Sequence, residues 1–325
     1  MGGKLINGIK AVDRYRSIQK LQYDLTREEL IVSTTDLFYG CLLAEKLVKL
    51  QEEALQIANS HLQRVQLFNR EGQVSEFDLL RAQLEVAKLQ PQLLQAQNQY
   101  ELALAAFQKH IGSIDPQDIP EGEFVLPETL EMTLEEALES GSSQRIELRL
   151  LDINTEIMKI RYNAEKGNYL PNVVLQGDYS LFTAADEYAI ESKDFGTQYT
   201  IGIGIQIPLF TGFSNSSKKA YAKHAWQQTK IQEQDYHELI ALEIRQAHQR
   251  LKNSLENYEV QAQNIRLAER SMELARLRYE NQVGIQLEVF DAQVMLNGVK
   301  LQYFQSIYEV ISSDRNFKKS IGYKL

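Results

Sequence analysis

Two stretches decide the fold: NYLPNVVLQGDYSLF, residues 168–182, and TQYTIGIGIQIPLFTG, residues 197–212. Along each arm, residues that are mostly apolar alternate with residues that are mostly small or polar. In the second arm the apolar set is Tyr199, Ile201, Ile203, Ile205 and Ile207. This period of two predicts strands with one apolar face, each about ten residues long, the length that a tilted strand needs to cross a bilayer. Because an isolated two-stranded hairpin is marginal in water, we expect something outside the chain to complete this one.

The composition excludes several classes of protein. The 325 residues carry a formal net charge of -9, with 44 Asp and Glu against 35 Lys and Arg, which argues against nucleic acid as a partner. The single cysteine, Cys41, excludes an internal disulfide and a zinc site built on several cysteines, and we expect it to be a small buried hydrophobe. The start, MGGKLINGIKAVDR, lacks the apolar core of a signal peptide. That fits a cytoplasmic protein, or a longer parent whose N-terminus is missing.

The prolines leave two very long stretches free of helix breakers, Ile9–Gln90 and Leu209–Leu325. We therefore expect helices over 9–70 and 213–281, about 90 and about 100 Å long at ~1.5 Å per residue. Helices of this length imply a coiled coil or a helical tube. The apolar residues support this, because they recur at steps of four and three and so form a stripe along one helix face. An example is Leu43, Leu47, Leu50, Ala54 and Ile57.

Each long helix is interrupted once, at NREGQVSEFD (69–78) and at NQVGIQLEVFD (281–291). Gly72 and Gly284 are expected to end the helices with positive φ, and Ser75 is expected to cap the returning helix. Each half is thus predicted to be an antiparallel helical hairpin with a tight tip. The return helices are expected over 82–111, kinked at Pro91, and over 292–320.

The resulting prediction is a mainly α protein of long helical hairpins with one β-hairpin. Three prolines make 112–132 an extended linker, followed by helices at 133–140 and 144–166. The expected domains are a first helical hairpin at 1–111, a linker at 112–145, a helix at 146–168, a transmembrane β-hairpin at 169–210 and a second helical hairpin at 211–325.

The two helical halves also resemble each other. FDLLRAQLEVAKLQ (77–90) aligns with LEVFDAQVMLNGVK (287–300), and LINGIKA (5–11) resembles LFTGFSN (209–215). The first repeat therefore begins where the second one leaves its β-hairpin. By this symmetry we expect the first repeat's own hairpin to have preceded Met1 in a longer parent.

The chain resembles the TolC-type outer-membrane efflux proteins over essentially its whole length. The most specific segments are NAEKGNYLPNVVLQGDYS (163–180), IGIQIPLFTGF (203–213), GQVSEFDLLRAQ (72–83) and RYENQVGIQLEVFDAQ (278–293). The resemblance implies a homotrimer with a β-barrel in outer-membrane lipid and a helical α-barrel in the periplasm. It also implies tips that face a periplasmic adaptor protein and an inner-membrane transporter. This chain offers half of the family's strands, so it resembles an N-terminally truncated member.

The resemblance also implies candidate gate residues. Asp291 and Glu288 match acidic positions on the second tip, Asp78 matches one on the first, and Tyr279 matches a gating aromatic. Some members carry a basic gating residue where this chain has Gly284, so a salt-bridge latch is not expected there. Three copies of Asp291 around one axis would favour cations. The alternative is that these acids are ordinary solvated charges at helix ends, favoured near a helix N-terminus by the helix dipole.

Passive conduction requires no nucleophile and no cofactor, so we expect no enzyme, no cofactor and no metal site. His224, His237 and His248 share one helix without acids or cysteines at ligand spacing. His61 continues the Leu43–Ile57 stripe and is expected to pack at an interface. Two functions remain open: an outer-membrane channel component of a tripartite efflux or type I secretion system, or a structural coiled-coil protein with a soluble β-hairpin. The isoleucine face favours the channel, because a soluble hairpin would expose it and aggregate.

Overall fold

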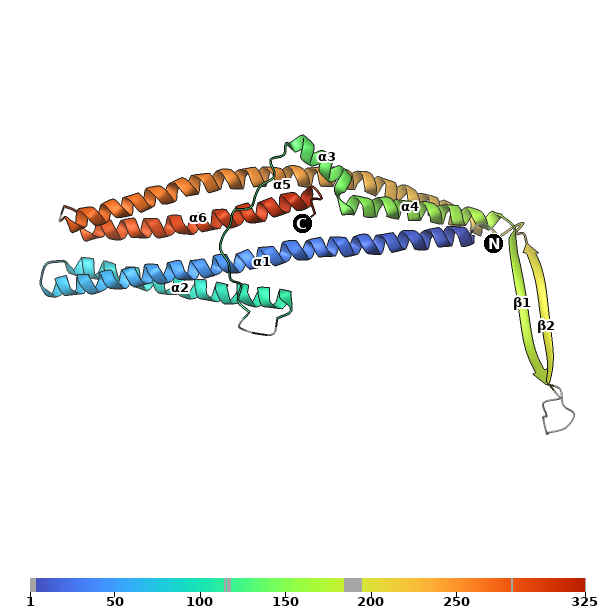
Figure 1. Ribbon diagram of the computed structural model, residues 1–325, viewed down its shortest axis with the longest axis horizontal. Coiled ribbons are helices and arrows are strands. Elements are labelled where there is room, and N and C mark those ends of the chain that lie inside the picture. The colour runs from blue at the N-terminus through green and yellow to red at the C-terminus, as the bar shows by residue number, and fades with distance from the viewer. Residues whose placement is uncertain (1–3, 114, 116–117, 184–194, 282, 325) are drawn as a thin grey trace. The chain divides into compact units, whose positions relative to one another are not determined.

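A computed structural model describes residues 4–113, 115, 118–183, 195–281 and 283–324. It confirms a mainly helical chain with one β-hairpin (Figure 1). The elements in chain order are α1 (Lys4–Arg70), α2 (Glu76–Ile111), α3 (Leu134–Gln144), α4 (Ile146–Lys166), the 3-10 helix η1 (Gly167–Tyr169), β1 (Asn172–Thr183), β2 (Phe195–Gln206), α5 (Ser214–Glu280) and α6 (Gln286–Ser320).

The two long helices predicted from the spacing of the prolines are both present. α1 and α5 each contain 67 residues, which gives a length of about 100 Å. The chain divides into two compact units, and both long helices contribute to each. The first unit comprises Met1–Leu25 and Ile146–Leu239, and the second comprises Thr26–Arg145 and Ile240–Leu325.

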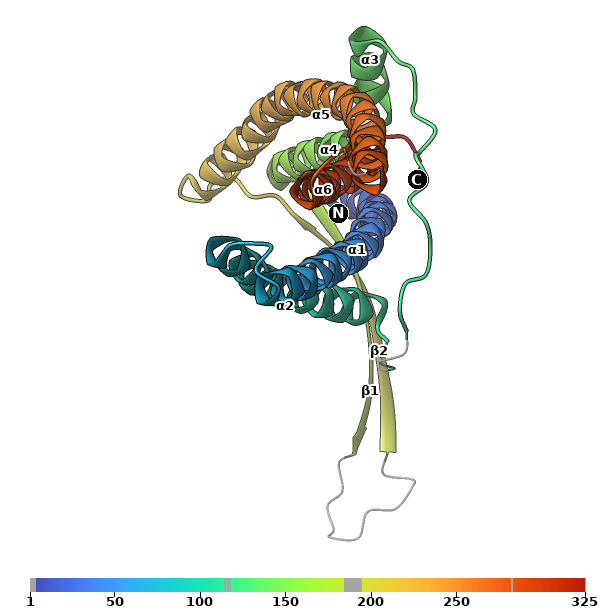
Figure 2. The same ribbon diagram turned by 90° about the vertical axis from the view of Figure 1, so that its left-hand side faces the viewer.

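The second unit contains the two helical hairpins. α1 lies beside α2 and α5 lies beside α6, as both views show (Figures 1 and 2). The C-terminal half of α6 supplies much of the core, because Val310 and Phe317 are fully buried, together with Ile244 of α5. Cys41 of α1 is also buried, as predicted. The linker packs Phe124 between Tyr39 of α1 and Phe304 of α6, with ring centroids 6.0 and 6.1 Å apart.

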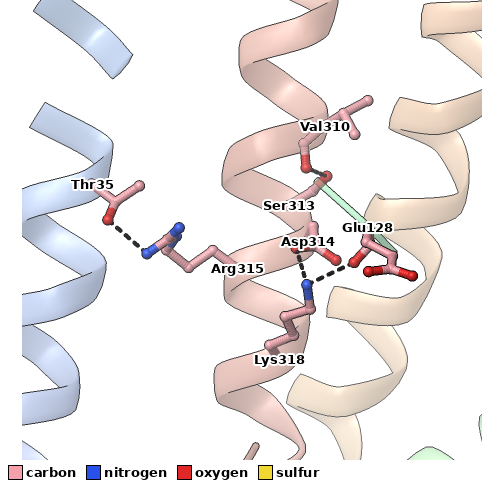
Figure 3. A network of polar contacts seen from close by, with 7 residues as sticks. All are labelled: Thr35, Glu128, Val310, Ser313, Asp314, Arg315 and Lys318. Carbon is pink, nitrogen blue, oxygen red and sulfur yellow. Dashed lines mark hydrogen bonds and ion pairs between the residues drawn. The ribbon is translucent and has the colours of Figure 1, made fainter. Parts of the chain in front are cut away.

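A partly buried polar network joins α6 to α1 and to the linker (Figure 3). Lys318 Nζ donates to Asp314 Oδ2 at 2.7 Å and to the carbonyl oxygen of Glu128 at 3.0 Å. Arg315 Nη1 donates to Thr35 Oγ1 at 2.6 Å. Burial raises the pKa of Asp314, and the neighbouring Lys318 opposes that shift. The charges are therefore held where water screens them little.

The tip of the first helical hairpin follows the sequence prediction at its turn. Gly72 has a φ of 75°, and Ser75 caps α2 in a reciprocal capping box with Asp78. The predicted starts of the return helices were too late. α2 begins at Glu76 and α6 at Gln286, because both helices resume directly after the turn. α2 continues through Pro91.

The prediction for Gly284 was wrong. Glycines with positive φ in the described chain are Gly72, Gly112, Gly212 and Gly322, so Gly284 is not one of them. A Cβ at Gly284 would lie 2.8 Å from Glu288 Oε2 and 3.0 Å from Arg278 Cβ. Glycine is therefore favoured at this position because the side chains of Glu288 and Arg278 leave little room for a Cβ, and not because the backbone has a positive φ. Gln282, which also belongs to the predicted tip, lies outside the described residues.

The first unit contains the β-hairpin, and its register aligns the two apolar faces. Leu175 pairs with Ile203, and Tyr179 pairs with Tyr199. On the opposite face glycines lie across from larger residues, for example Gly196 opposite Phe182, whose ring fills the space above it. The polar loop expected between the arms falls on 184–194, outside the described residues. Gly212 and Phe213, with φ of 58° and 65°, turn the chain from the hairpin into α5.

Candidate gate at the helical tips

The first tip is closed by backbone and side-chain hydrogen bonds. The backbone N–H of Gln73 donates to the carbonyl of Phe68 at 2.8 Å, and that of Gly72 donates to Asn69 at 3.0 Å. Asn69 Nδ2 donates to the carbonyl of Val74 at 3.1 Å. These bonds satisfy carbonyls that the end of α1 would otherwise leave unpaired, so the turn is compact and rigidly connected to α2.

Asp78 has a structural role in this tip. Its Oδ2 accepts from the hydroxyl of Ser75 at 2.6 Å and from the backbone N–H of Ser75 at 3.2 Å. The hydrogen bonds from Ser75 lower the pKa of Asp78. The carboxylate is exposed and charged, and it stabilises the start of α2.

The second tip is closed by backbone hydrogen bonds to the carbonyl of Arg278 and carries an exposed ion pair. Arg278 Nε of α5 lies 3.4 Å from Glu288 Oε2 of α6, and both side chains are largely exposed. Asn281 Nδ2 donates to the carbonyl of Leu277 at 2.8 Å. Ile285, the residue before α6, provides no side-chain cap, unlike Ser75 at the first tip. The Arg278–Glu288 pair therefore adds a contact between the two arms to a turn that backbone hydrogen bonds already close.

His61 lies between the two helical hairpins. Its ring stacks on Phe290 of α6 with centroids 5.0 Å apart and an interplanar angle of 20°, which confirms the predicted packing role. Its Nδ1 is buried and has no hydrogen-bond partner among the described residues. Burial lowers the pKa of His61, Arg64 lowers it further, and Asp291 partly offsets these effects. Protonation of His61 is therefore less favourable between the two helical hairpins than in water.

Two cavities flank the His61–Phe290 stack. The first, of about 400 Å³, is lined by Asp78 and Asp291 among others, and the second, of about 410 Å³, is lined by Tyr279. Both cavities include Gln286 in their linings. The structure thus brings Asp78 and Asp291 to one cavity and places Tyr279 at its neighbour. Glu288 lines neither cavity and pairs with Arg278 instead.

Sequence reasoning missed Phe290 and Arg278. Phe290 lies in the quoted tip motif, but only its position against His61 marks it as an interface residue. Arg278 begins the same motif, but only its position beside Glu288 marks it as part of an ion pair. In the described part of the chain, no group of three or more His, Cys, Asp or Glu side chains is placed to hold a metal ion. Nor does any helix in that part have the length and apolar character to cross a membrane.

The comparison with protein families decides the identification. The outer membrane efflux protein family matches residues 147–323, which comprise α4, the β-hairpin, α5 and α6. The chain belongs to the outer membrane efflux protein family. The matched part of this efflux protein therefore includes the second tip with Tyr279, Glu288 and Asp291. A comparison with curated proteins found no match.

Solved structures of channels share the fold of this efflux protein. The structure of CusC superimposes with a TM-score of 0.82 at 16% identity, covering 99% of this chain and 75% of CusC. The Vibrio cholerae outer membrane protein VceC gives 0.77 at 17% identity, with 99% and 76% covered. The Campylobacter jejuni CmeC outer membrane channel gives 0.81 at 17% identity, with 99% and 68% covered. At these identities the likeness establishes the fold.

Proposed function

We propose that this chain is the outer-membrane channel component of a tripartite efflux or type I secretion system. Three copies form a tube that conducts substrates passively. A periplasmic adaptor protein and an inner-membrane transporter act on the tips and supply the energy. The protein is not an enzyme in this proposal, because a conducting tube needs a wet lumen and a closable end rather than a reacting group.

The observation that carries the proposal is the register of the β-hairpin. It gathers most of the apolar residues of both strands on one face, whereas the other face carries glycines and polar residues together with Val174 and Phe182. Tyr199 and Ile203 are 78% and 73% exposed in the single chain. Burying one such side chain contributes roughly 1.5–3 kcal/mol, so a face built from several of them favours lipid strongly. This supports the strands as part of a barrel wall and argues against a soluble assembly hairpin.

The small residues on the other face support a water-filled interior. Gly202 and Gly204 alternate with the isoleucines and leave open space beside the strand. A wall of this kind leaves room for substrate and exposes backbone polarity to water. The long paired helices supply the tunnel that extends into the periplasm.

We further propose that the four candidate residues act at the periplasmic gate. Three copies of Asp291, supported by Asp78 at the same cavity, create a negative potential that attracts cations. Glu288 contributes through its pair with Arg278, which links the arms of the second tip. Tyr279 lines the neighbouring cavity and moves with α5 when the tips separate.

Neutralising the second tip tests this assignment. In planar bilayers the natural trimer carrying Asp291→Asn and Glu288→Gln should show a lower ratio of cation to anion permeability than the parent. A matched control is Asp235→Asn with Glu238→Gln, which removes the same charges at the same spacing from exposed positions on α5, far from the tip. The gate assignment is wrong if the tip variant keeps the parent's selectivity, or if the control loses as much.

A further inference from the structure

Four lysines of the first unit lie over three aromatic rings along the segments of α4, η1 and α5 that lead to and from the β-hairpin. Lys166 Nζ is 4.3 Å from the centroid of Tyr162, and Lys219 Nζ is 5.6 Å from that of Tyr169. Two more lysine nitrogens flank the ring of Trp226, at 4.6 and 6.0 Å. We call this set the lysine–aromatic seam: Lys159, Lys166, Lys219, Lys230, Tyr162, Tyr169 and Trp226.

Helical spacing aligns the members of the seam on two helices, α4 and α5, and Tyr169 is added from η1. On α4 the members recur at intervals of three and four residues, so they share one face. On α5 the spacing from Lys219 through Trp226 to Lys230 also keeps one face. Tyr162 stacks on Trp226 with centroids 5.8 Å apart and an interplanar angle of 17°, which joins the two faces. Three of the ammonium groups thereby lie along the Tyr162–Trp226 pair, and the fourth, that of Lys219, lies over the separate ring of Tyr169.

Among the residues that the structure describes, these lysines have no carboxylate partner. Within the described chain, none of the four forms an ion pair with a carboxylate. Two nearby carboxylates are engaged elsewhere: Glu156 pairs with Arg14 at 2.7 Å, and Glu165 accepts from Asn168 Nδ2 at 2.7 Å. Residues 211–232 contain lysines and no Asp or Glu, although the whole chain has a net charge of -9.

Exposed apolar side chains continue the seam towards the strands. Leu170 precedes β1, and Leu209, Phe210 and Phe213 follow β2, with exposed fractions of 54%, 93%, 77% and 75%. Phe210 and Phe213 meet edge to face with centroids 5.7 Å apart. Aromatic and apolar residues followed by lysines are the composition that proteins place at the boundary between hydrocarbon and headgroups.

We infer that the lysine–aromatic seam binds the phosphate groups of anionic phospholipids at the inner edge of the outer membrane. This inference rests on the proposed function, which places the β-hairpin in lipid. Each lysine turns one side of its ammonium group to a ring, which restrains it, and has further N–H donors for a phosphate oxygen. The continuity of the seam with the membrane-facing strands identifies a lipid headgroup, rather than a free anion, as the ligand. Its binding fixes the depth of the hairpin.

The sole tryptophan of the chain, Trp226, provides a direct probe of this site. The full chain is mixed with phosphatidylcholine vesicles whose acyl chains carry bromine, with or without phosphatidylglycerol. We expect phosphatidylglycerol to increase the quenching of Trp226 fluorescence. Changing all four seam lysines to glutamine should weaken the apparent affinity for these vesicles by about tenfold or more, whereas changing them to arginine should preserve it.

A control variant removes the same charge from the second unit, with Gln at Lys46, Lys88, Lys109 and Lys252. It should bind as the parent does, and circular dichroism should report equal helix content in all variants. The inference is overturned if Trp226 is not quenched, or if its quenching does not depend on phosphatidylglycerol. It is also overturned if the control variant loses as much affinity for the vesicles as the seam variant does. Inorganic phosphate that abolishes the effect, where chloride of equal ionic strength does not, would also overturn it by identifying a free-anion site. Channel conductance in phosphatidylcholine alone tests the proposed function separately.

Discussion

At the scale of single residues, neighbours on other helices decide the chemistry. His61 belongs to a regular stripe on α1, yet its ionisation depends on Phe290, Arg64 and Asp291, of which only Arg64 is close in sequence. Gly284 likewise owes its identity to Glu288 and Arg278 on the two arms of the tip. Sequence periodicity predicts that such residues face inward, but it contains no information about what they meet.

The lowered pKa of His61 predicts a pH dependence of stability. As the pH falls, the unfolded chain takes up the proton on His61 before the folded chain does. The contribution of His61 is therefore complete above the usual histidine pKa near 6.5 and is lost as the pH falls below it. Urea unfolding at pH 7 and pH 5 should show a smaller loss of stability for His61→Phe than for the parent. Equal losses in both proteins would contradict the assignment.

The pair of Asp314 and Lys318 predicts a large cost for removing one partner. Lys318→Met leaves the Asp314 carboxylate buried without its ammonium group, and should lower the free energy of unfolding by about 3 kcal/mol. The double variant Asp314→Asn, Lys318→Met should lose less, because no buried charge remains. Lys319→Met, the neighbouring change on α6, should stay within about 0.5 kcal/mol of the parent. If Lys318→Met and Lys319→Met are equally mild, the buried pair does not contribute as described.

At the scale of elements, much of the fold follows from the sequence. The absence of proline predicts α1 and α5, and the alternation in the two arms predicts both strands and their shared face. Ser75 predicts the cap of α2, but the starts of α2 and α6 were missed because a capping box and a short turn need no intervening loop. The cavities at the tips could not be predicted, since they depend on how one helical hairpin packs against the other.

Alanine is expected to have opposite effects on stability at Gly284, in the second tip, and at Gly298, inside α6. Gly284→Ala would press a methyl group against Glu288 and Arg278, and should destabilise the chain by about 1 kcal/mol while loosening their ion pair. Gly298→Ala, inside α6 with open space around it, should stabilise the chain by about 1 kcal/mol. Thermal unfolding of the two variants measures both effects. A Gly284→Ala variant as stable as Gly298→Ala would contradict the close packing of the tip.

At the scale of the whole molecule, the sequence alone predicts the family and a role in transport across the outer membrane. The resemblance rested on the strand arms and tips, and the family match over 147–323 agrees with it. The roles of Asp78, Asp291, Glu288 and Tyr279 remain proposals, because selectivity belongs to the assembled tube and one chain contributes only its own share of the lumen. The lysine–aromatic seam was not predicted, since its members are dispersed over two helices and η1.

Cysteine labelling along β2 tests most directly whether the hairpin forms part of a channel wall. Single cysteines are placed at Ile201, Gly202, Ile203 and Gly204 in a Cys41→Ala background, in cells with intact outer membranes. A membrane-impermeant maleimide should label the two glycine positions, which face the water-filled interior. It should reach the two isoleucine positions only after detergent dissolves the membrane. Equal labelling of all four positions in intact membranes would contradict the account, because a hairpin exposed to water on both faces gives that result.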